Sequence, residues 1–289
     1  MKKYEVIKNY RNDDKLRASF NDLAKKTFDL KFEDWYQNGY WGDNYNPYSI
    51  VIDGKVASNV SVNKTDFIWN GEKKHLIQLG TVMTEEKYRN QGLARQIMVE
   101  IEKDYTEADG IYLLANDSVL DFYPKFGFIR AKEYQYEKQV MISREKSMIQ
   151  IPMEDKAAWD KLEAAIKCSV CYSSFELTDN SSLIMFYVTK FMRKNVYYDE
   201  KLKAYAIAEI ENGDLLIHNI FSEKEISVDK VIEAFGKEIT GVSLGFTPKD
   251  KEGYSVSERK EEDTTLFLKG NVFDRFEQDR LMIPLLAHA

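Results

Sequence analysis

The chain has 289 residues, 44% of them apolar, and its 41 basic and 48 acidic residues give a net charge of -7. This length and apolar content suit about two domains of ordinary size, each with a hydrophobic core. The negative net charge disfavours a nucleic-acid-binding protein that relies on attraction to phosphates. The first 15 residues hold no apolar run, and the longest apolar run, residues 182–192, is too short to cross a membrane. We therefore expect a cytoplasmic protein with neither nucleic-acid nor membrane partners.

In the first half of the chain, two helices are expected to precede a run of strands. Apolar periodicity predicts a helix over residues 14–27 and a second, short helix around residues 32–40. Three strands are then predicted over residues 48–52, 55–69 and 74–83, separated by the hairpin signals Asp53-Gly54 and Asn70-Gly71. They are followed by a helix to about residue 105, a strand over 111–115 and a strand pair over 128–136 and beyond.

The stretch YRNQGLAR, residues 88–95, stands between the third of these strands and the helix that follows. Such a turn leaves several backbone N–H groups at the start of a helix unpaired and pointing the same way, which is a ready site for a phosphate. Gly92 lets an anion approach the backbone because it has no side chain. Taken alone, the octet is equally compatible with an ordinary loop before a helix.

A second motif follows after the strand over 111–115. In LDFYPKFGF, residues 120–128, Tyr123 stands on a short turn that Gly127 closes. Together the two motifs resemble the acetyl-CoA-binding core of the GNAT superfamily of N-acetyltransferases, with a phosphate loop at 89–94 and a tyrosine turn at 123–128. Two motifs in order and at the family's spacing are more specific than either alone.

The resemblance implies an α/β (α+β) fold, a mixed and largely antiparallel sheet flanked by helices, with acetyl-CoA as co-substrate and no metal. In the family, the strand before the loop splays from its neighbour to admit the thioester, and a free N–H there serves the oxyanion. The implied coenzyme contacts are Val82, Met83, Thr84, Arg89, Asn90, Gln91, Gly92, Leu93, Ala94, Arg95 and Asn116. Gly80 interrupts the same β-rich strand, which indicates a bulge or a close backbone approach.

Tyr123 matches the family's general acid. The reference pKa of tyrosine, about 10, is close to that of an alkyl thiol, so that proton transfer to the leaving thiolate is nearly balanced. The other interpretation is a core tyrosine packed against Phe126 and Phe128.

The general base is not identified by the sequence. Many members of the family carry a glutamate on the strand before the loop, but residues 73–84 hold no carboxylate. Gln78 can only position a water, and His75 stands at the beginning of the strand. The amine is expected to arrive neutral or to lose its proton through water.

Acceptor specificity in the family comes from the first two helices and their loop. The substrate-contact candidates in this region are Trp35, Tyr36 and Trp41, and the neighbouring acids are Glu33, Asp34 and Asp43. Aromatic faces and carboxylates suit an ammonium group, each cation–π contact contributing about 0.5 to 2 kcal/mol. The alternative is ordinary amphipathic helix packing with a charged outer face.

The second half of the chain repeats this outline. The predicted elements are helices over 154–167, 181–192 and 228–235 and strands over 195–198, 203–210, 214–221 and 239–246. We expect two GNAT-like domains, a catalytic one over residues 1–145 and a degenerate one over 150–289. The segment SEKEIS, residues 222–227, replaces the phosphate loop with two glutamates and no glycine, so the second domain is expected not to bind coenzyme A. It is expected to complete the substrate cleft, to support a homodimer or only to stabilise the chain.

The sequence thus predicts an N-acetyltransferase that moves an acetyl group from acetyl-CoA to a primary amine of a small cationic molecule, by direct attack in a ternary complex. Two alternatives stay open, a non-catalytic acyl-CoA sensor or interaction protein and a protein or peptide N-acetyltransferase. The tandem arrangement also resembles aminoglycoside acetyltransferases of the enhanced intracellular survival type. We expect their further C-terminal domain to be missing, so that their catalytic terminal carboxylate is not carried over to Ala289.

Overall fold

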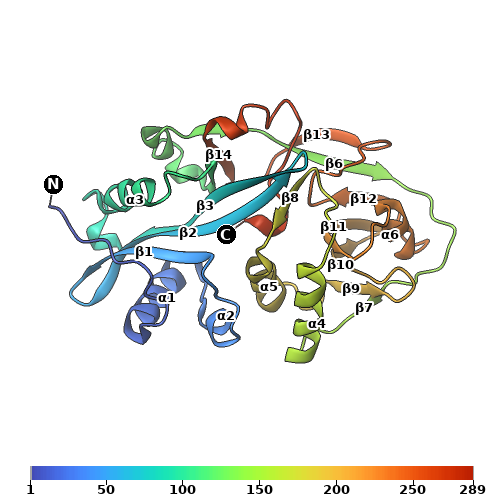
Figure 1. The fold of residues 1–289 in the computed structure, drawn as a ribbon, viewed down its shortest axis with the longest axis horizontal. Coiled ribbons are helices and arrows are strands. Elements are labelled where there is room, and N and C mark those ends of the chain that lie inside the picture. Colours follow the sequence, from blue (N-terminus) through green and yellow to red (C-terminus); the bar gives the residue numbers. More distant parts are fainter. Residues whose placement is uncertain (1, 289) are drawn as a thin grey trace.

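Two mixed β-sheets lie side by side in the computed structural model, which describes residues 2–288, so that the expectation for Ala289 lies outside the described residues (Figure 1). The helices are α1 (Asp14–Phe28), α2 (Glu33–Gln37), α3 (Leu93–Asp104), α4 (Lys156–Lys167), α5 (Ser181–Lys190) and α6 (Val228–Ala234). The strands are β1 (Tyr45–Ile52), β2 (Lys55–Trp69), β3 (Glu72–Thr84), β4 (Gly110–Ala115), β5 (Ile129–Ala131), β6 (Glu133–Gln139), β7 (Ile149–Gln150), β8 (Phe175–Thr178), β9 (Val196–Asp199), β10 (Ala204–Glu211), β11 (Asp214–Phe221), β12 (Gly241–Leu244), β13 (Ser255–Arg259) and β14 (Thr265–Lys269).

The first sheet has the order β1-β2-β3-β4-β14-β5, and β8 pairs with the far end of β2. Its strands are antiparallel except for β3 and β4, which run parallel because α3 connects them. Both predicted hairpin turns are confirmed, and Asp53 and Gly54 have φ of +52° and +73°, as a two-residue turn of this kind requires. α1 and α3 cover opposite faces of this sheet (Figure 1).

The second sheet repeats the first, with the order β13-β6-β12-β11-β10-β9-β7. Here β11 and β12 form the parallel pair, connected by α6 as β3 and β4 are connected by α3. The mixed α/β fold with two GNAT-like sheets, expected from the resemblance, is therefore confirmed. Within residues 2–288, none of the helices combines the length and the apolar character that crossing a bilayer requires.

The two halves of the chain exchange a strand. The pair expected over residues 128–136 is wrong, because β5 joins the first sheet whereas β6 crosses to the second and lies between β12 and β13. In return β14, for which no element was predicted, inserts between β4 and β5. The exchanged strands are deeply buried at Tyr136 and at Phe267. The boundary expected at residues 145–150 therefore separates two halves of the sequence, but each half contributes strands to both sheets.

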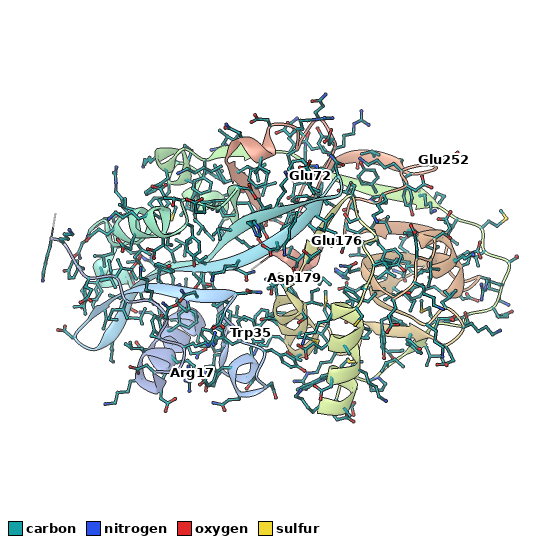
Figure 2. All side chains as sticks on the ribbon, viewed as in Figure 1. Arg17, Trp35, Glu72, Glu176, Asp179 and Glu252 are labelled. Carbon is teal, nitrogen blue, oxygen red and sulfur yellow. The ribbon has the colours of Figure 1, made fainter. Side chains whose placement is uncertain are left out.

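The halves also share one hydrophobic core. The rings of Phe32 and Phe186, from the loop before α2 and from α5, stack with centroids 5.3 Å apart. Trp35 Nε1 donates to the backbone oxygen of Ser182, 3.0 Å away, at the N-terminal end of α5. β8 adds a buried carboxylate at the junction, Glu176, which lies in the middle of the molecule (Figure 2). The position of α5 against α2 is thus set by aromatic packing and not by a flexible linker.

Candidate active site

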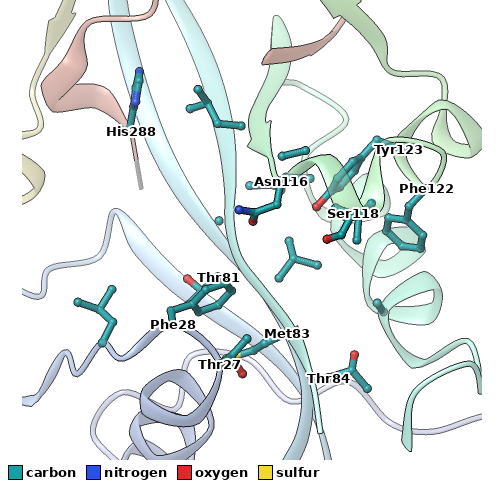
Figure 3. Close-up of a pocket in the computed structure, with 18 of the residues that line it drawn as sticks. Thr27, Phe28, Thr81, Met83, Thr84, Asn116, Ser118, Phe122, Tyr123 and His288 are labelled. Carbon is teal, nitrogen blue, oxygen red and sulfur yellow. The ribbon is translucent and has the colours of Figure 1, made fainter. Parts of the chain in front are cut away.

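A cavity of about 900 Å³ lies where β3 and β4 separate (Figure 3). The two strands pair only where Leu76, Ile77 and Gln78 meet the residues from Gly110 to Tyr112. β3 then continues to Thr84 with no described strand on that side, so its backbone groups face the cavity. This is the splay that the resemblance leads us to expect.

The bulge predicted at Gly80 is confirmed and lies at this separation. Ser61 of β2 pairs with Gly80 but Asn59 pairs with Met83, so the β3 strand carries one residue more than its partner. The extra length places Thr81 at a φ of +46°. Its hydroxyl forms a hydrogen bond with the hydroxyl of Tyr45, which anchors the bulge to β1.

The predicted phosphate loop ends in a helix start that no side chain caps. Gly92 is the N-cap residue of α3, with a φ of +78°. Side chains cap the N-termini of α1, α4, α5 and α6, and these caps are Asp13, Asp155, Asn180 and Ser227. The first N–H groups of α3 therefore stay available to an anion, which is the arrangement that a pyrophosphate needs.

Replacing Gly92 with alanine is expected to weaken acetyl-CoA binding about 10- to 100-fold, the loss of about one hydrogen bond to a charged group. Isothermal titration calorimetry measures this. The matched control is Gly54→Ala, since Gly54 has a similar φ of +73° but stands in the open β1–β2 turn. In both variants the alanine must adopt a backbone conformation with positive φ, which costs about 1 to 2 kcal/mol of stability. Only the Gly92 variant should lose affinity for acetyl-CoA. Equal affinities in the two variants would argue against a phosphate site at α3.

Tyr123 opens the tyrosine turn at the other side of the cavity. Its ring packs in the core against Phe128 and Phe267, with centroids 6.1 and 5.5 Å away. Its hydroxyl points into the cavity and forms no hydrogen bond with any residue of the described part of the chain (Figure 3). Burial raises the pKa of Tyr123 to about 12. The ring thus belongs to the core, as the second interpretation states, while the free hydroxyl leaves the general-acid role a prediction.

Most of the expected coenzyme contacts line this one cavity. They are Val82, Met83, Thr84, Arg89, Asn90, Gly92, Leu93, Ala94, Arg95 and Asn116. Gln91 does not line it, because its side-chain amide turns back and donates to the backbone oxygen of Lys87 at 3.1 Å. Asn116 is held by Asp263, whose carboxylate accepts from its amide nitrogen at 2.8 Å.

Of the three substrate-contact candidates, the structure brings only Trp35 to the cavity. Tyr36 lies outside, with the guanidinium of Arg17 3.8 Å from the centre of its ring. Trp41 is buried in the aromatic core, where its Nε1 donates to the backbone oxygen of Tyr45 at 2.9 Å.

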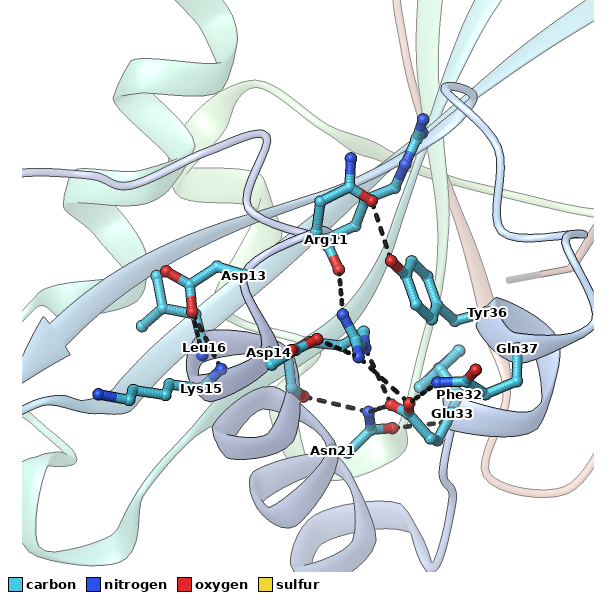
Figure 4. A network of polar contacts seen from close by, with 12 residues as sticks. Arg11, Asp13, Asp14, Lys15, Leu16, Asn21, Phe32, Glu33, Tyr36 and Gln37 are labelled. Atoms are coloured by element: carbon cyan, nitrogen blue, oxygen red, sulfur yellow. Dashed lines mark hydrogen bonds and ion pairs between the residues drawn. The ribbon is translucent and has the colours of Figure 1, made fainter.

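The acids of this region also lie outside the cavity, which agrees with the alternative of helix packing with a charged outer face. Glu33 accepts hydrogen bonds from Arg17 and Asn21 in a network of polar contacts (Figure 4). Asp43 pairs with Arg11, with 2.6 Å between the nearest charged atoms, and Asp34 is exposed. Glu33 and Asp43 are thus paired with arginines, Arg17 on α1 and Arg11 before it, to which no sequence pattern connects them.

The two polar residues considered as substitutes for a base do not line the cavity either. His75 Nδ1 lies 2.8 Å from a carboxylate oxygen of Asp66, and its side chain is exposed. Gln78 is buried and accepts a hydrogen bond from Asn63. Glu72, the one carboxylate of β3, does not line the cavity either, so β3 supplies no candidate for the general base.

The second half of the chain supplies a wall of the cavity whose residues the sequence does not predict. The wall consists of Leu183, Phe186 and Tyr187 of α5, together with Phe191 and His288. The hydroxyl of Tyr187 donates to the backbone oxygen of His288, and burial lowers the pKa of that histidine to about 4. The only signal in the sequence is the unusually apolar run over residues 182–192. Of the roles weighed for the second half, completing the cleft agrees with this wall.

The equivalent region of the second sheet is closed. Ser227 caps α6 with its own side chain, so fewer N–H groups are free than at α3. β11 and β12 of the second sheet correspond to β3 and β4 of the first. At the position where β3 and β4 separate, the N–H of Gly245, which follows β12, donates to the backbone oxygen of Ile217 in β11 at 2.7 Å. The oxygen of Gly245 in turn accepts from the N–H of Leu285 at 2.9 Å, so the end of the chain fills the gap.

Residues 9–128 match the family model described as "Acetyltransferase (GNAT) family". Among solved structures, the chain is similar to a conserved protein of unknown function from Enterococcus faecalis V583, a probable N-acyltransferase, with a TM-score of 0.62 and 16% identity over 92% of this chain and 72% of the other. It is also similar to a GCN5-related N-acetyltransferase from Kribbella flavida, with a TM-score of 0.55 and 14% identity over 91% and 71%. Eis1 from Mycobacterium abscessus gives 0.55 and 11% over 91% and 73%. No curated protein matches the sequence significantly. At these identities the structural likeness shows the fold.

Proposed function

Since residues 9–128 form a GNAT acetyltransferase domain and the chain is a transferase, we propose that it transfers the acetyl group of acetyl-CoA to a primary amine of a small molecule that is cationic in water. Acyl-CoA co-substrates are typical of the family. The observation that carries the proposal is that the free hydroxyl of Tyr123 and the uncapped start of α3 open into the same cavity.

In this proposal the pyrophosphate of the co-substrate binds the first N–H groups of α3. Arg89, Arg95 and Lys125 line this end of the cavity and add positive charge. The unpaired edge of β3, from Val82 to Thr84, pairs with the amides of the pantetheine arm. An N–H group of this edge stabilises the oxyanion, a contribution of about 3 kcal/mol to the barrier.

The reaction is a direct attack within the ternary complex. The amine, already deprotonated by water, attacks the thioester carbonyl, so that a C–N bond forms and the C–S bond breaks. Tyr123 donates its proton to the departing thiolate and regains one as the amine nitrogen loses its second proton. The products are the amide and coenzyme A, and no other reactant is needed.

The raised pKa of Tyr123 gives a pH profile that can be measured. A tyrosine with a pKa of about 12 stays protonated, and thus able to donate, throughout the range in which an alkylamine becomes neutral. We expect kcat/KM to rise from about pH 6 to about pH 10 without an alkaline decline. A fall in rate between about pH 8 and pH 10 would show that an acid with a lower pKa is required.

We propose further that residues 1–145 carry the catalysis and that residues 150–289 are a degenerate GNAT-like half without a coenzyme site. The capped start of α6 and the closed gap at Gly245 support this. The test combines a calorimetric titration with an acetylation assay over a panel of amines. We expect one acetyl-CoA bound per chain and release of coenzyme A when an amine is added. Binding without acetylation of any amine or peptide would favour an acyl-CoA sensor instead.

A further inference from the structure

We infer that the acceptor carries its amine on an apolar body, aromatic or branched aliphatic, and is not a polycation. This inference rests on the proposed function and refines its acceptor. Three features of the cavity support it: the charges on its wall, the side chains opposite Tyr123, and the hydrogen-bonding groups that are already used.

No aspartate or glutamate lines the cavity among residues 2–288. Its charged side chains, Arg89, Arg95 and Lys125, are positive and come from the phosphate loop and the tyrosine turn. A polyamine or an aminoglycoside would bring several ammonium groups into this space without a counter-charge from residues 2–288. Burying unpaired charges is costly, so only an acceptor that loses its single charge before reaction suits the site.

The wall that α5 and the segment around α2 build is apolar and rigid. Phe32 and Phe186 stack with an interplanar angle of 10°, and Trp35 meets Phe186 edge-on with a centroid distance of 5.3 Å. Phe28 and Phe191 also line the cavity, with 43% and 57% of their surface exposed. Exposed aromatic side chains at the rim of an apolar wall are what an apolar ligand entering from solvent would cover.

Three polar groups on this side already have partners within the protein, and Nε2 of His288, which has none among the described residues, is itself buried. The hydroxyl of Tyr45 is bonded to Thr81, and the hydroxyl of Tyr187 donates to His288. Trp35 Nε1 donates to Ser182. A polyhydroxylated acceptor would therefore bury hydroxyl groups that find no partner, whereas an aromatic or aliphatic body loses nothing there.

The first test compares kcat/KM, at fixed acetyl-CoA, for 2-phenylethylamine and hexylamine with that for spermidine and kanamycin. We expect the two apolar amines to be preferred by at least about 100-fold. Preference for spermidine or kanamycin would overturn the inference and leave the proposed function standing. Binding of acetyl-CoA with no acetylation of any amine would overturn the proposed function, and the inference with it. A faster reaction of octanoyl-CoA than of acetyl-CoA with ethanolamine would assign the apolar wall to the acyl chain and overturn the inference alone.

The second test places a carboxylate at the rim. Phe28→Glu changes an exposed side chain, so the fold should be preserved, and we expect it to shift the ratio of kcat/KM for spermidine over 2-phenylethylamine upward by at least about tenfold. Ile149→Glu is the matched control, because Ile149 is 64% exposed and lies on β7 outside the cavity. An unchanged ratio in Phe28→Glu, or an equal shift in Ile149→Glu, would overturn the inference.

Discussion

Replacing Tyr123 with phenylalanine is expected to lower kcat by about 100- to 10,000-fold, the range that a positioned general acid contributes, while acetyl-CoA affinity stays nearly unchanged. The variant removes only the hydroxyl, which forms no hydrogen bond within the described residues and points into the cavity. The ring contacts with Phe128 and Phe267 remain. Single-turnover kinetics and calorimetry measure the two quantities separately.

Tyr88→Phe is the matched control for this experiment. Tyr88 also lines the cavity but stands immediately before the phosphate loop and not on the tyrosine turn. We expect its kcat to stay within a few-fold of that of the wild type. Equal turnover in Tyr123→Phe and wild type across the amine panel would remove the general-acid role, even if both bind acetyl-CoA.

A fragment that ends at residue 145 is expected not to fold, although it contains every motif of the proposed acetyl-CoA site. Without β14, the first sheet loses the strand between β4 and β5, with the buried side chains of Leu266, Phe267 and Leu268. Each buried side chain of this size contributes about 1.5 to 3 kcal/mol, so together they are comparable with the net stability of a whole domain, about 5 to 15 kcal/mol. The fragment also exposes Tyr136 of β6, which is fully buried in the second sheet. Circular dichroism and amide NMR dispersion of the fragment test this.

Co-expression of residues 1–145 with residues 146–289 is the control. The cut falls in an exposed segment, since Arg144, Glu145 and Lys146 are all exposed, so both exchanged strands remain available for pairing. We expect the two pieces to purify as a one-to-one complex that binds acetyl-CoA. A folded, acetyl-CoA-binding fragment 1–145 on its own would show that the strand exchange is dispensable.

The elements that depend on neighbouring residues could be predicted from the sequence. α1 was expected over residues 14–27 and forms from Asp14 to Phe28, because its apolar spacing and its cap, Asp13, are local. The hairpin turns at Asp53 and Asn70 follow from residues that tolerate a positive φ. The uncapped helix start at Gly92 is local in the same sense.

The side of the cavity proposed for the coenzyme is built from motifs that the sequence predicts for the same reason, since the loop, the strand and the tyrosine turn are each short. The acceptor side could not. Glu33 is neutralised by Arg17 from another helix, and the facing wall comes from Phe186, which is more than 140 residues from Trp35. No spacing in the sequence connects these residues.

The sequence by itself therefore determined the helices, the hairpins and the phosphate loop, because capping, turn geometry and apolar periodicity act within a few residues. Only the tertiary structure decided which sheet received β6 and β14, and which side chains faced Tyr123. The alternation of apolar residues predicts that a segment forms a strand, but it does not determine which strand will pair with it. The two sheets have the same strand order and offer equivalent edges, so β6 and β14 could be assigned to a sheet only from the tertiary structure.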